Sequence, residues 1–307
     1  MAIVRRPRFQ RFAVAYPFQL TTRDIDIIRR IARHRFLNSV QITQLVSGSH
    51  QQTLRRLQAL YHHGYLDRPR CQIDHFHQLG TKPMVYGVTR RGARVLNAGN
   101  DVQAQQRRWT LNNAMATRMF LDHTLQVADV MIAFELACRR AARATFVRAD
   151  ELSLTSVFED SASFRWNVSF AGEEITVIPD AVFALDLERD DGRRERVHYF
   201  LEADRGTMPV IRKKLRQTSL LRKLLAYEAT WSQGVHRAVL GIDRFRVLTV
   251  TTNRTRVEHL RGACSRLQRG HGLFLFTDLN ALRCSDDLFS LNWSTAKHSP
   301  ATGTLLV

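Results

Sequence analysis

Three carboxylates close two successive apolar segments in the second half of the chain. Asp180 ends the segment ITVIPD, and Glu202 and Asp204 end the segment VHYFLEAD. Because side chains alternate along a strand, Glu202 and Asp204 share one face of it. If the two strands are neighbours, the three carboxylates converge, and oxygen ligands of this kind suit Mg²⁺ or Mn²⁺. The chemistry expected of such a site is metal-assisted cleavage of a phosphodiester.

The same residues also fit a purely structural role, as solvated strand ends or as partners in ion pairs. The candidate partners are Arg205, Arg212 and Lys213, which follow closely in the chain. The sequence leaves the metal site and the ion pairs both open.

A helix is predicted to follow the carboxylates, from about Pro209 to Trp231. At helical spacing it carries a polar stripe that could contact a phosphate backbone. The stripe consists of Arg212, Arg216, Ser219 and Lys223. A charged stripe is usually no more than the solvent-exposed face of a helix, and the spacing does not separate these cases.

The elements that must position these residues alternate between helices and strands. The sequence predicts a long helix at 117–142, strands between 152 and 204, the helix at 209–231, a strand at 245–252, a helix at 254–268 and a strand at 272–277. This order is typical of a mixed sheet covered by helices, in an α+β or α/β domain.

The charge of the chain points to a polyanionic partner. Its 307 residues include 46 Lys and Arg against 28 Asp and Glu, a net charge of +18. Residues 1–110 hold 19 of the basic and 5 of the acidic side chains, a balance of +14. The positive field is therefore concentrated in the N-terminal third, which favours double-stranded DNA as the partner.

The N-terminal third is predicted to form a winged helix-turn-helix. Three helical segments, at 22–36, 39–46 and 50–63, precede two short β-prone segments and a short helix at 90–99. In such a module the third helix enters the major groove of DNA. Winged helices also serve as protein-protein modules, which is the alternative interpretation.

The third of these helices has the outer face expected of a recognition helix. Leu54, Leu57 and Tyr61 are predicted to face the core. Glutamine and arginine pair with adenine and guanine edges, and arginines in the wing can neutralise phosphates. The residues expected to contact DNA are Gln51, Gln52, Arg55 and Arg56 on the helix and Arg68 and Arg70 in the wing, with Arg212 and Arg216 as further candidates.

The predicted domains are the winged helix-turn-helix at 1–97, a linker at 98–116 and the mixed-sheet domain at 117–307. No run of the sequence approaches the roughly 18 apolar residues of a membrane helix. The N-terminus also lacks the apolar segment of a secretory signal. A cytoplasmic protein without a membrane partner is therefore expected.

Several of these segments together resemble the replication-relaxation family, which includes the MobC-type relaxases of mobilisable plasmids and integrative elements. The likeness rests on LDHTLQVADV, IPDAVFALDL, FLEADRGT and the spacing of Lys223 and Tyr227, and it covers about residues 20–250. The C-terminal domain of that family is similar to the PD-(D/E)xK restriction-endonuclease fold. The resemblance implies that Asp180 is the PD aspartate and Glu202 the first acidic residue of the signature.

The sequence departs from this signature at its lysine, where Asp204 stands instead. The resemblance to the wider nuclease fold leaves two possibilities open: an acidic residue is tolerated there and the metal alone suffices, or the next helix supplies the lysine, where Lys213, Lys214 and Lys223 are available. The function implied is metal-dependent nicking of DNA at an origin of transfer, by an endonuclease or relaxase of a mobile element. Relaxosome or replication proteins and a second copy of the chain are further candidate partners. The alternative is a non-enzymatic regulator of replication or transcription with a degenerate nuclease-like domain.

Overall fold

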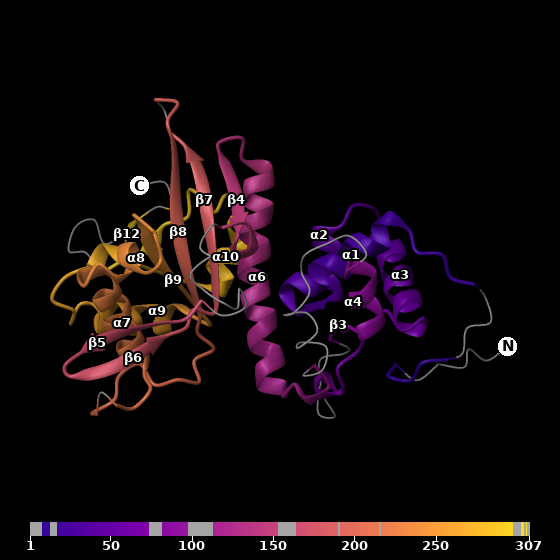
Figure 1. Cartoon of the computed structure of the whole chain (residues 1–307), viewed down its shortest axis with the longest axis horizontal. Helices are drawn as coiled ribbons and strands as arrows, with labels where there is room; N and C mark the ends of the chain where they lie inside the picture. Colours follow the sequence, from indigo (N-terminus) through magenta and orange to yellow (C-terminus); the bar gives the residue numbers. More distant parts are fainter. Residues whose placement is uncertain are drawn as a thin grey trace. The chain divides into compact units, whose positions relative to one another are not determined.

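The computed structural model describes residues 8–12, 17–73, 82–97, 113–152, 164–189, 191–214, 216–296, 302–303 and 305. The chain divides into two compact units, residues 1–129 and 130–307, and the boundary lies within helix α6 (Arg118–Arg140). Both units combine helices with strands (Figure 1). The predicted α+β class is confirmed, whereas most of the predicted linker lies outside the described residues.

The N-terminal unit packs its helices on a small antiparallel sheet with the strand order β1-β3-β2. Its elements are α1 (Thr22–His34), β1 (Phe36–Asn38), α2 (Ser39–Leu45), α3 (His50–His62), β2 (Leu66–Asp67), the 3-10 helix η1 (Arg70–Gln72), β3 (Val85–Val88), α4 (Arg90–Asn97) and the 3-10 helix η2 (Asn113–Met115). Helix α1 begins at a capping box, in which the Thr21 side chain accepts from the Asp24 amide and the Asp24 carboxylate accepts from the Thr21 amide.

Helix α3 buries a different stripe from the one predicted. Thr53, Leu57, Leu60 and Tyr61 face the core, whereas Leu54 is 37% exposed. The reason is that Arg23 reaches across from α1 and donates a hydrogen bond to the Thr53 hydroxyl at 2.6 Å. A polar side chain with a bonded partner therefore occupies the core position that the apolar pattern assigned to leucine.

The C-terminal unit is built on a seven-stranded mixed sheet with the order β12-β11-β10-β9-β8-β7-β4. Strands β8, β9 and β10 are parallel, and the remaining pairs are antiparallel. Its further elements are β4 (Ala144–Arg148), η3 (Ala149–Glu151), β5 (Trp166–Phe170), β6 (Glu173–Val177), β7 (Ala181–Glu188), β8 (Arg194–Ala203), α7 (Leu220–Ser232), α8 (Val235–Ala238), β9 (Phe245–Thr251), α9 (Arg254–Cys264), η5 (His271–Leu273), β10 (Phe274–Asp278), α10 (Leu279–Cys284), β11 (Trp293–Ser294) and β12 (Thr302–Gly303).

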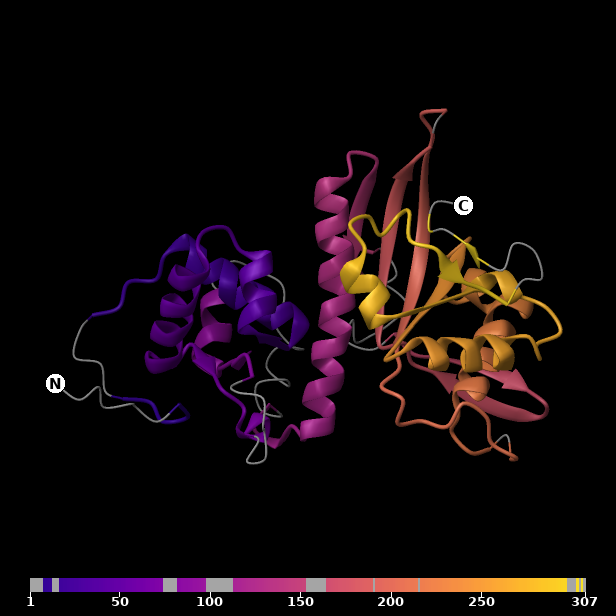
Figure 2. The same cartoon turned by 180° about the vertical axis from the view of Figure 1, so that it is seen from behind.

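Helices cover both faces of this sheet (Figures 1 and 2). On one face, Phe134 of α6 packs against Phe183 of β7, with ring centroids 4.9 Å apart. On the other face, α7, α9 and the separate two-stranded sheet β5-β6 enclose the main hydrophobic core around Phe200 and Val247. This second face carries the candidate site, because Glu202 follows Phe200 on the same side of β8.

The helix predicted at 209–231 begins only at Leu220. The Ser219 side chain caps it by accepting a hydrogen bond from the Arg222 amide. The preceding residues form a loop, held where Leu220 donates to the Pro209 carbonyl at 3.1 Å. The predicted polar stripe is therefore wrong. Arg212 and Arg216 lie in this loop, where Arg212 donates to the Thr218 carbonyl and Arg216 pairs with Glu173.

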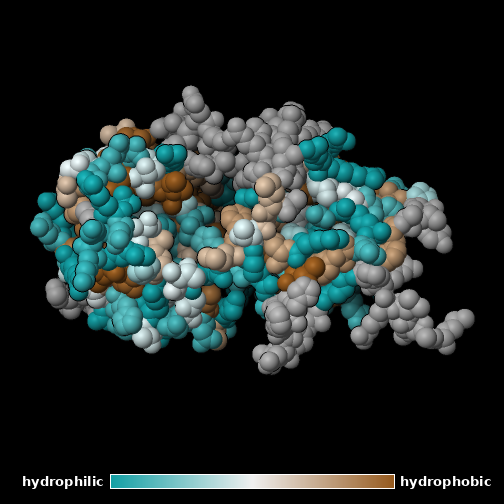
Figure 3. Space-filling view, turned by 90° about the horizontal axis from the view of Figure 1, so that it is seen from below, coloured by the Kyte–Doolittle hydropathy of each residue, from teal (hydrophilic) through white to brown (hydrophobic). Residues whose placement is uncertain are grey.

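Strand β4 was not predicted, and residues 153–163, at the start of the predicted run of strands from 152 to 204, lie outside the described residues. Within the described part of the chain, no helix combines the length and the apolar character needed to cross a bilayer. The surface seen in Figure 3 is mainly hydrophilic, with hydrophobic residues in small patches.

Candidate functional site

The sheet register brings Asp180 and Glu202 together. Ala181 pairs with Leu201 in the antiparallel ladder of β7 and β8, so Asp180 stands opposite Glu202. Asp180 continues that ladder, since its amide donates to the Leu201 carbonyl and its carboxylate accepts from the Ala203 amide at 2.8 Å. Residues directly opposite each other point to the same face of a sheet. The predicted proximity of these two carboxylates is therefore present.

Helix α7 supplies two donors to Glu202. Lys223 donates to Oε2 and the Tyr227 hydroxyl donates to Oε1, the latter at 2.6 Å. The two donors are four residues apart, so they lie on one face of the helix. Glu202 is only 4% exposed. Of the two candidate lysines, the structure brings Lys223 to the carboxylate and leaves Lys213 exposed in the loop before α7.

The environment shifts the ionisation of this cluster. Burial raises the pKa of Glu202 to about 7, and the negative charge of Asp180 acts in the same direction against the opposing effect of Lys223 and Tyr227. Burial lowers the pKa of Lys223, but attraction to Glu202 and Asp180 outweighs it, so that pKa is raised. Both pKa values are raised: that of Glu202 mainly by burial and that of Lys223 mainly by attraction to Glu202, while the charge of Asp180 adds to each shift.

Asp204 does not join this cluster. Arg256 of α9 binds its carboxylate with two nitrogens, Nε to Oδ2 at 2.7 Å and Nη2 to Oδ1 at 3.1 Å. The Thr251 hydroxyl and the Gly206 amide donate to the same two oxygens. Asp204 is 6% exposed. The expectation that it converges with Asp180 and Glu202 is corrected, because a bidentate arginine takes the place that a cation would need.

The arrangement as it stands does not fit a divalent cation shared by the three carboxylates. Across the described ranges, no three His, Cys, Asp or Glu side chains are grouped so that they could hold a metal ion. The cavity between Glu202 and Lys223 measures about 10 Å³, which is the room that one water needs. Instead, Lys223 of α7 pairs with Glu202, and Arg256 of α9 pairs with Asp204.

The N-terminal unit places three of the four predicted helix residues at the surface. Gln51, Gln52 and Arg55 are exposed on α3. Arg56 is not available in the same way, because its Nε donates to Oδ1 of Asp24 at 2.8 Å and its Nη2 donates to Oδ2. The expectation that Arg56 points outward is corrected, since the buried Asp24 carboxylate draws it back onto α1.

The two arginines predicted in the wing also differ from each other. Arg70 is exposed. Arg68 stacks on the Tyr61 ring, with its guanidinium carbon 4.0 Å from the centroid, and donates to the Tyr86 hydroxyl at 3.3 Å. A guanidinium held between rings is less free to follow a phosphate. Residues 74–81, between these arginines and β3, lie outside the described residues.

Sequence reasoning missed Arg256, the residue whose guanidinium binds the Asp204 carboxylate. The two are 52 residues apart. No local spacing links them, and only the packing of α9 beside the end of β8 brings them into contact.

Comparisons with known proteins add one finding. A family model described as Replication-relaxation matches residues 28–243, more than half of the chain. The match includes Asp180, Glu202, Lys223 and Tyr227. No curated protein and no solved structure matches the sequence.

Proposed function

This chain belongs to the replication-relaxation family, and we propose that it is a DNA-binding protein acting in the replication or mobilisation of a plasmid or integrative element. The proposal assigns duplex binding to the N-terminal unit, as a winged helix-turn-helix with α3 as its recognition helix. It makes the C-terminal unit a nuclease-like domain whose carboxylates are ion-paired. Replication or relaxosome proteins and a second copy of the chain are further proposed partners.

The observation that carries the proposal is the exposed polar face of α3. Gln51, Gln52 and Arg55 project from it, while Leu57 and Leu60 anchor the opposite face in the core. Side chains of these types recognise adenine and guanine edges in the major groove. The charge balance of +14 over residues 1–110 supports the same partner.

The contacts behind this face keep it in position. Arg56 reaches from α3 to Asp24, and Arg23 reaches from α1 to Thr53, so two arginines tie the helices together in opposite directions. A recognition face held by packed and bonded neighbours loses less conformational entropy on binding. In this proposal Arg56 is a positioning residue, and Arg55 beside it contacts the base.

The experiment compares two arginine variants on a duplex that the wild-type chain has selected from a random-sequence library. Arg55→Ala should weaken binding to that duplex by about tenfold or more, because one bidentate base contact is lost. Arg254→Ala removes the same charge from an exposed position on α9 and should leave the affinity within about twofold. Wild-type affinity in Arg55→Ala would overturn the choice of recognition helix, and failure to select any duplex would overturn the proposal.

A second candidate function, cleavage of a DNA strand, is favoured by the meeting of Asp180, Glu202 and Lys223. Two carboxylates on neighbouring strands and a lysine on the next helix are the groups that the nuclease-like signature requires. Donors occupy both oxygens of Glu202 as the chain stands. Cleavage would therefore require α7 to release this carboxylate first.

Nicking of supercoiled plasmid, with and without Mg²⁺ or Mn²⁺, separates the two candidates. The first proposal expects no nicking by the wild-type chain under either condition. The second expects nicking that Glu202→Gln and Lys223→Met abolish and that Lys213→Met retains, since Lys213 is a matched lysine in the exposed loop. Equal nicking by all four chains would point to a contaminating nuclease and contradict the second candidate.

A further inference from the structure

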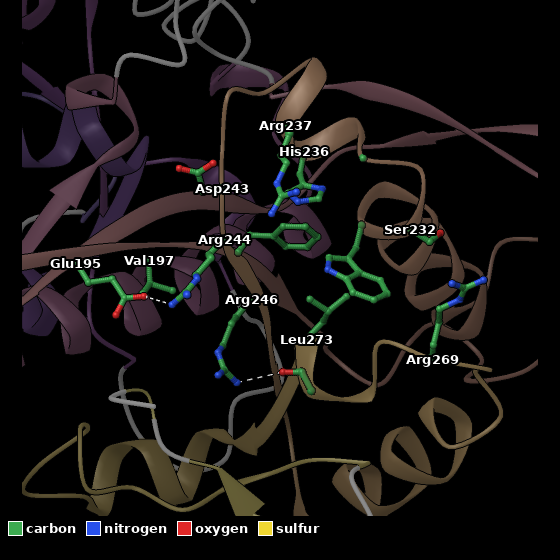
Figure 4. A pocket seen from close by; sticks show the side chains of 14 residues that line it. Glu195, Val197, Ser232, His236, Arg237, Asp243, Arg244, Arg246, Arg269 and Leu273 are labelled. Carbon is green, nitrogen blue, oxygen red and sulfur yellow. Dashed lines mark hydrogen bonds and ion pairs between the residues drawn. The ribbon is translucent and has the colours of Figure 1, made fainter.

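A hollow of about 600 Å³ opens at the end of the sheet opposite Glu202 (Figure 4). Glu195 lines it from the start of β8, whereas Glu202 lies seven residues further along the same strand. Seven residues of extended strand span roughly 23 Å. The hollow is therefore separate from the carboxylate cluster, and its volume lies within the range of ligand sites.

Four arginines from three segments of the chain line this hollow. They are Arg237 of α8, Arg244 just before β9 and Arg246 within it, and Arg269 after α9. Figure 4 shows them around the same opening, with Arg244 turned toward Glu195 and Arg246 toward the Gly272 carbonyl. Glu195 and Asp243 are the carboxylates of the lining, so positive charge is in excess.

Two of these arginines are placed so that they can bind an anionic ligand. Within the described residues, the Arg237 guanidinium has neither a hydrogen-bond nor an ion-pair partner, and it is exposed. Arg269 is 66% exposed and approaches Glu228 only at 3.8 Å. Guanidinium groups of this kind bind phosphate oxygens with two parallel hydrogen bonds.

An exposed indole lies in the same lining. Trp231, in the last turn of α7, is 39% exposed, whereas the other two described tryptophans, Trp166 and Trp293, are buried. An aromatic ring left open beside arginines provides a stacking surface for an unpaired base. Bases within a duplex already stack on each other, so a single strand fits this surface better.

The hollow continues into a neighbouring groove of about 1000 Å³, with which it shares Glu195, Asp243 and Arg244. Together the two are lined by eight arginines and three carboxylates, and one of the arginines, Arg196, is paired with a fourth carboxylate, Asp186, so positive charge stays in excess. Positive charge that extends beyond one pocket suits a chain of phosphates better than a single phosphate group.

We propose that the hollow and this groove bind single-stranded nucleic acid. One base stacks on Trp231, Arg237 and Arg269 contact the neighbouring phosphates, and the groove guides the continuing strand. The choice of DNA as this strand rests on the function proposed above. The site gives the C-terminal unit a binding role that does not depend on its carboxylates.

The test measures binding of the full chain to fluorescein-labelled dT20 by anisotropy. Trp231→Ala should weaken binding by about tenfold, and Arg237→Ala should lower the salt dependence of the affinity by about one phosphate contact. Arg254→Ala is the matched control and should bind as wild type. Stacking should also quench tryptophan fluorescence, and Trp231→Phe should remove that quenching while the buried Trp166 and Trp293 keep their emission.

The possible outcomes distinguish this site from the duplex-binding face of α3. Trp231→Ala should leave affinity for the selected duplex unchanged, and Arg55→Ala should leave affinity for dT20 unchanged. Wild-type affinity for dT20 in both Trp231→Ala and Arg237→Ala would overturn the inference, as would equal competition by an unlabelled hairpin duplex. If the chain selects no duplex and nicks no plasmid while the dependence on Trp231 persists, the proposed function fails and this site remains.

Discussion

Two buried carboxylates, one in each unit and each paired with a cation, have pKa values shifted in opposite directions. Asp24 in the N-terminal unit is 0% exposed and binds Arg56. Glu202 in the C-terminal unit is 4% exposed and binds Lys223. The pKa of Asp24 is lowered, although burial alone would raise it, whereas the pKa of Glu202 is raised to about 7.

The difference in pKa comes from the cost of burial, from the donors and from one neighbour. Asp24 accepts from two nitrogens of Arg56 and from both the amide and the hydroxyl of Thr21. Glu202 accepts from Lys223 and Tyr227 and has the like charge of Asp180 beside it. The donors of Asp24 together outweigh the cost of its burial, whereas burial is the largest effect on the pKa of Glu202 and the charge of Asp180 adds to it. Asp24 therefore has the properties of a structural group, and Glu202 those of a group that can exchange a proton near neutral pH.

The largest effect is expected from Asp24→Ala. This change removes the capping partner of α1 and leaves Arg56 without its anion, so it should lower the free energy of unfolding by about 3 kcal/mol. Asp26→Ala on the same helix breaks only a partly exposed pair with Arg30 and should cost no more than about 0.5 kcal/mol. Urea denaturation measures both. Equal losses of unfolding free energy in the two variants would contradict the stabilising role assigned to the contacts of Asp24.

A smaller effect is expected in the pH dependence of stability. Between pH 5 and 7 the folded chain retains on Glu202 a proton that the unfolded chain has released, since the folded pKa is about 7. The stabilising contribution of Glu202 should therefore decline by about 2 kcal/mol as the pH rises through this window. Glu202→Gln should lack this decline when urea unfolding is compared at the two pH values. A decline of the same size in the variant would assign it to other groups.

Asp24 should respond to pH in the opposite sense. Because its folded pKa is lowered, its contribution is present above the unfolded value of 3.8 and is lost as the pH falls below that value. Comparing the profiles of Asp24→Ala and Glu202→Gln over pH 2 to 8 would thus place the two effects in separate windows.

The smallest effect is expected from Tyr227→Phe. Loss of the hydroxyl that donates to Glu202 should cost about 1 kcal/mol and raise the pKa of that carboxyl further. Tyr199→Phe is the matched control, because the Tyr199 hydroxyl donates to the Leu305 carbonyl instead. Both variants should lose stability, but only Tyr227→Phe should move to higher pH the range over which the contribution of Glu202 to stability declines. A shift in both would break the link between Tyr227 and Glu202.

The parts of the fold that sequence reasoning predicted depend on local periodicity. Apolar spacing located α1, α2 and α3, and the strand pattern put Asp180 and Glu202 at the ends of what proved to be paired strands. The errors occurred where another interaction competed with the pattern. Helix α7 begins at Leu220, eleven residues after its predicted start at Pro209, because the Ser219 side-chain cap outweighed continuous helix propensity.

The sequence by itself determined which residues share a face: Glu202 with Asp204 on a strand, and Lys223 with Tyr227 on a helix. It also determined where the positive charge is concentrated. Only the tertiary structure decided that Asp204 would be bound by Arg256 and Glu202 by Lys223, and that arginines from α8, β9 and the segment after α9 would surround Trp231. The physical reason is that strand and helix periods act over a few residues, whereas the neutralisation of a buried charge depends on which distant element packs against it.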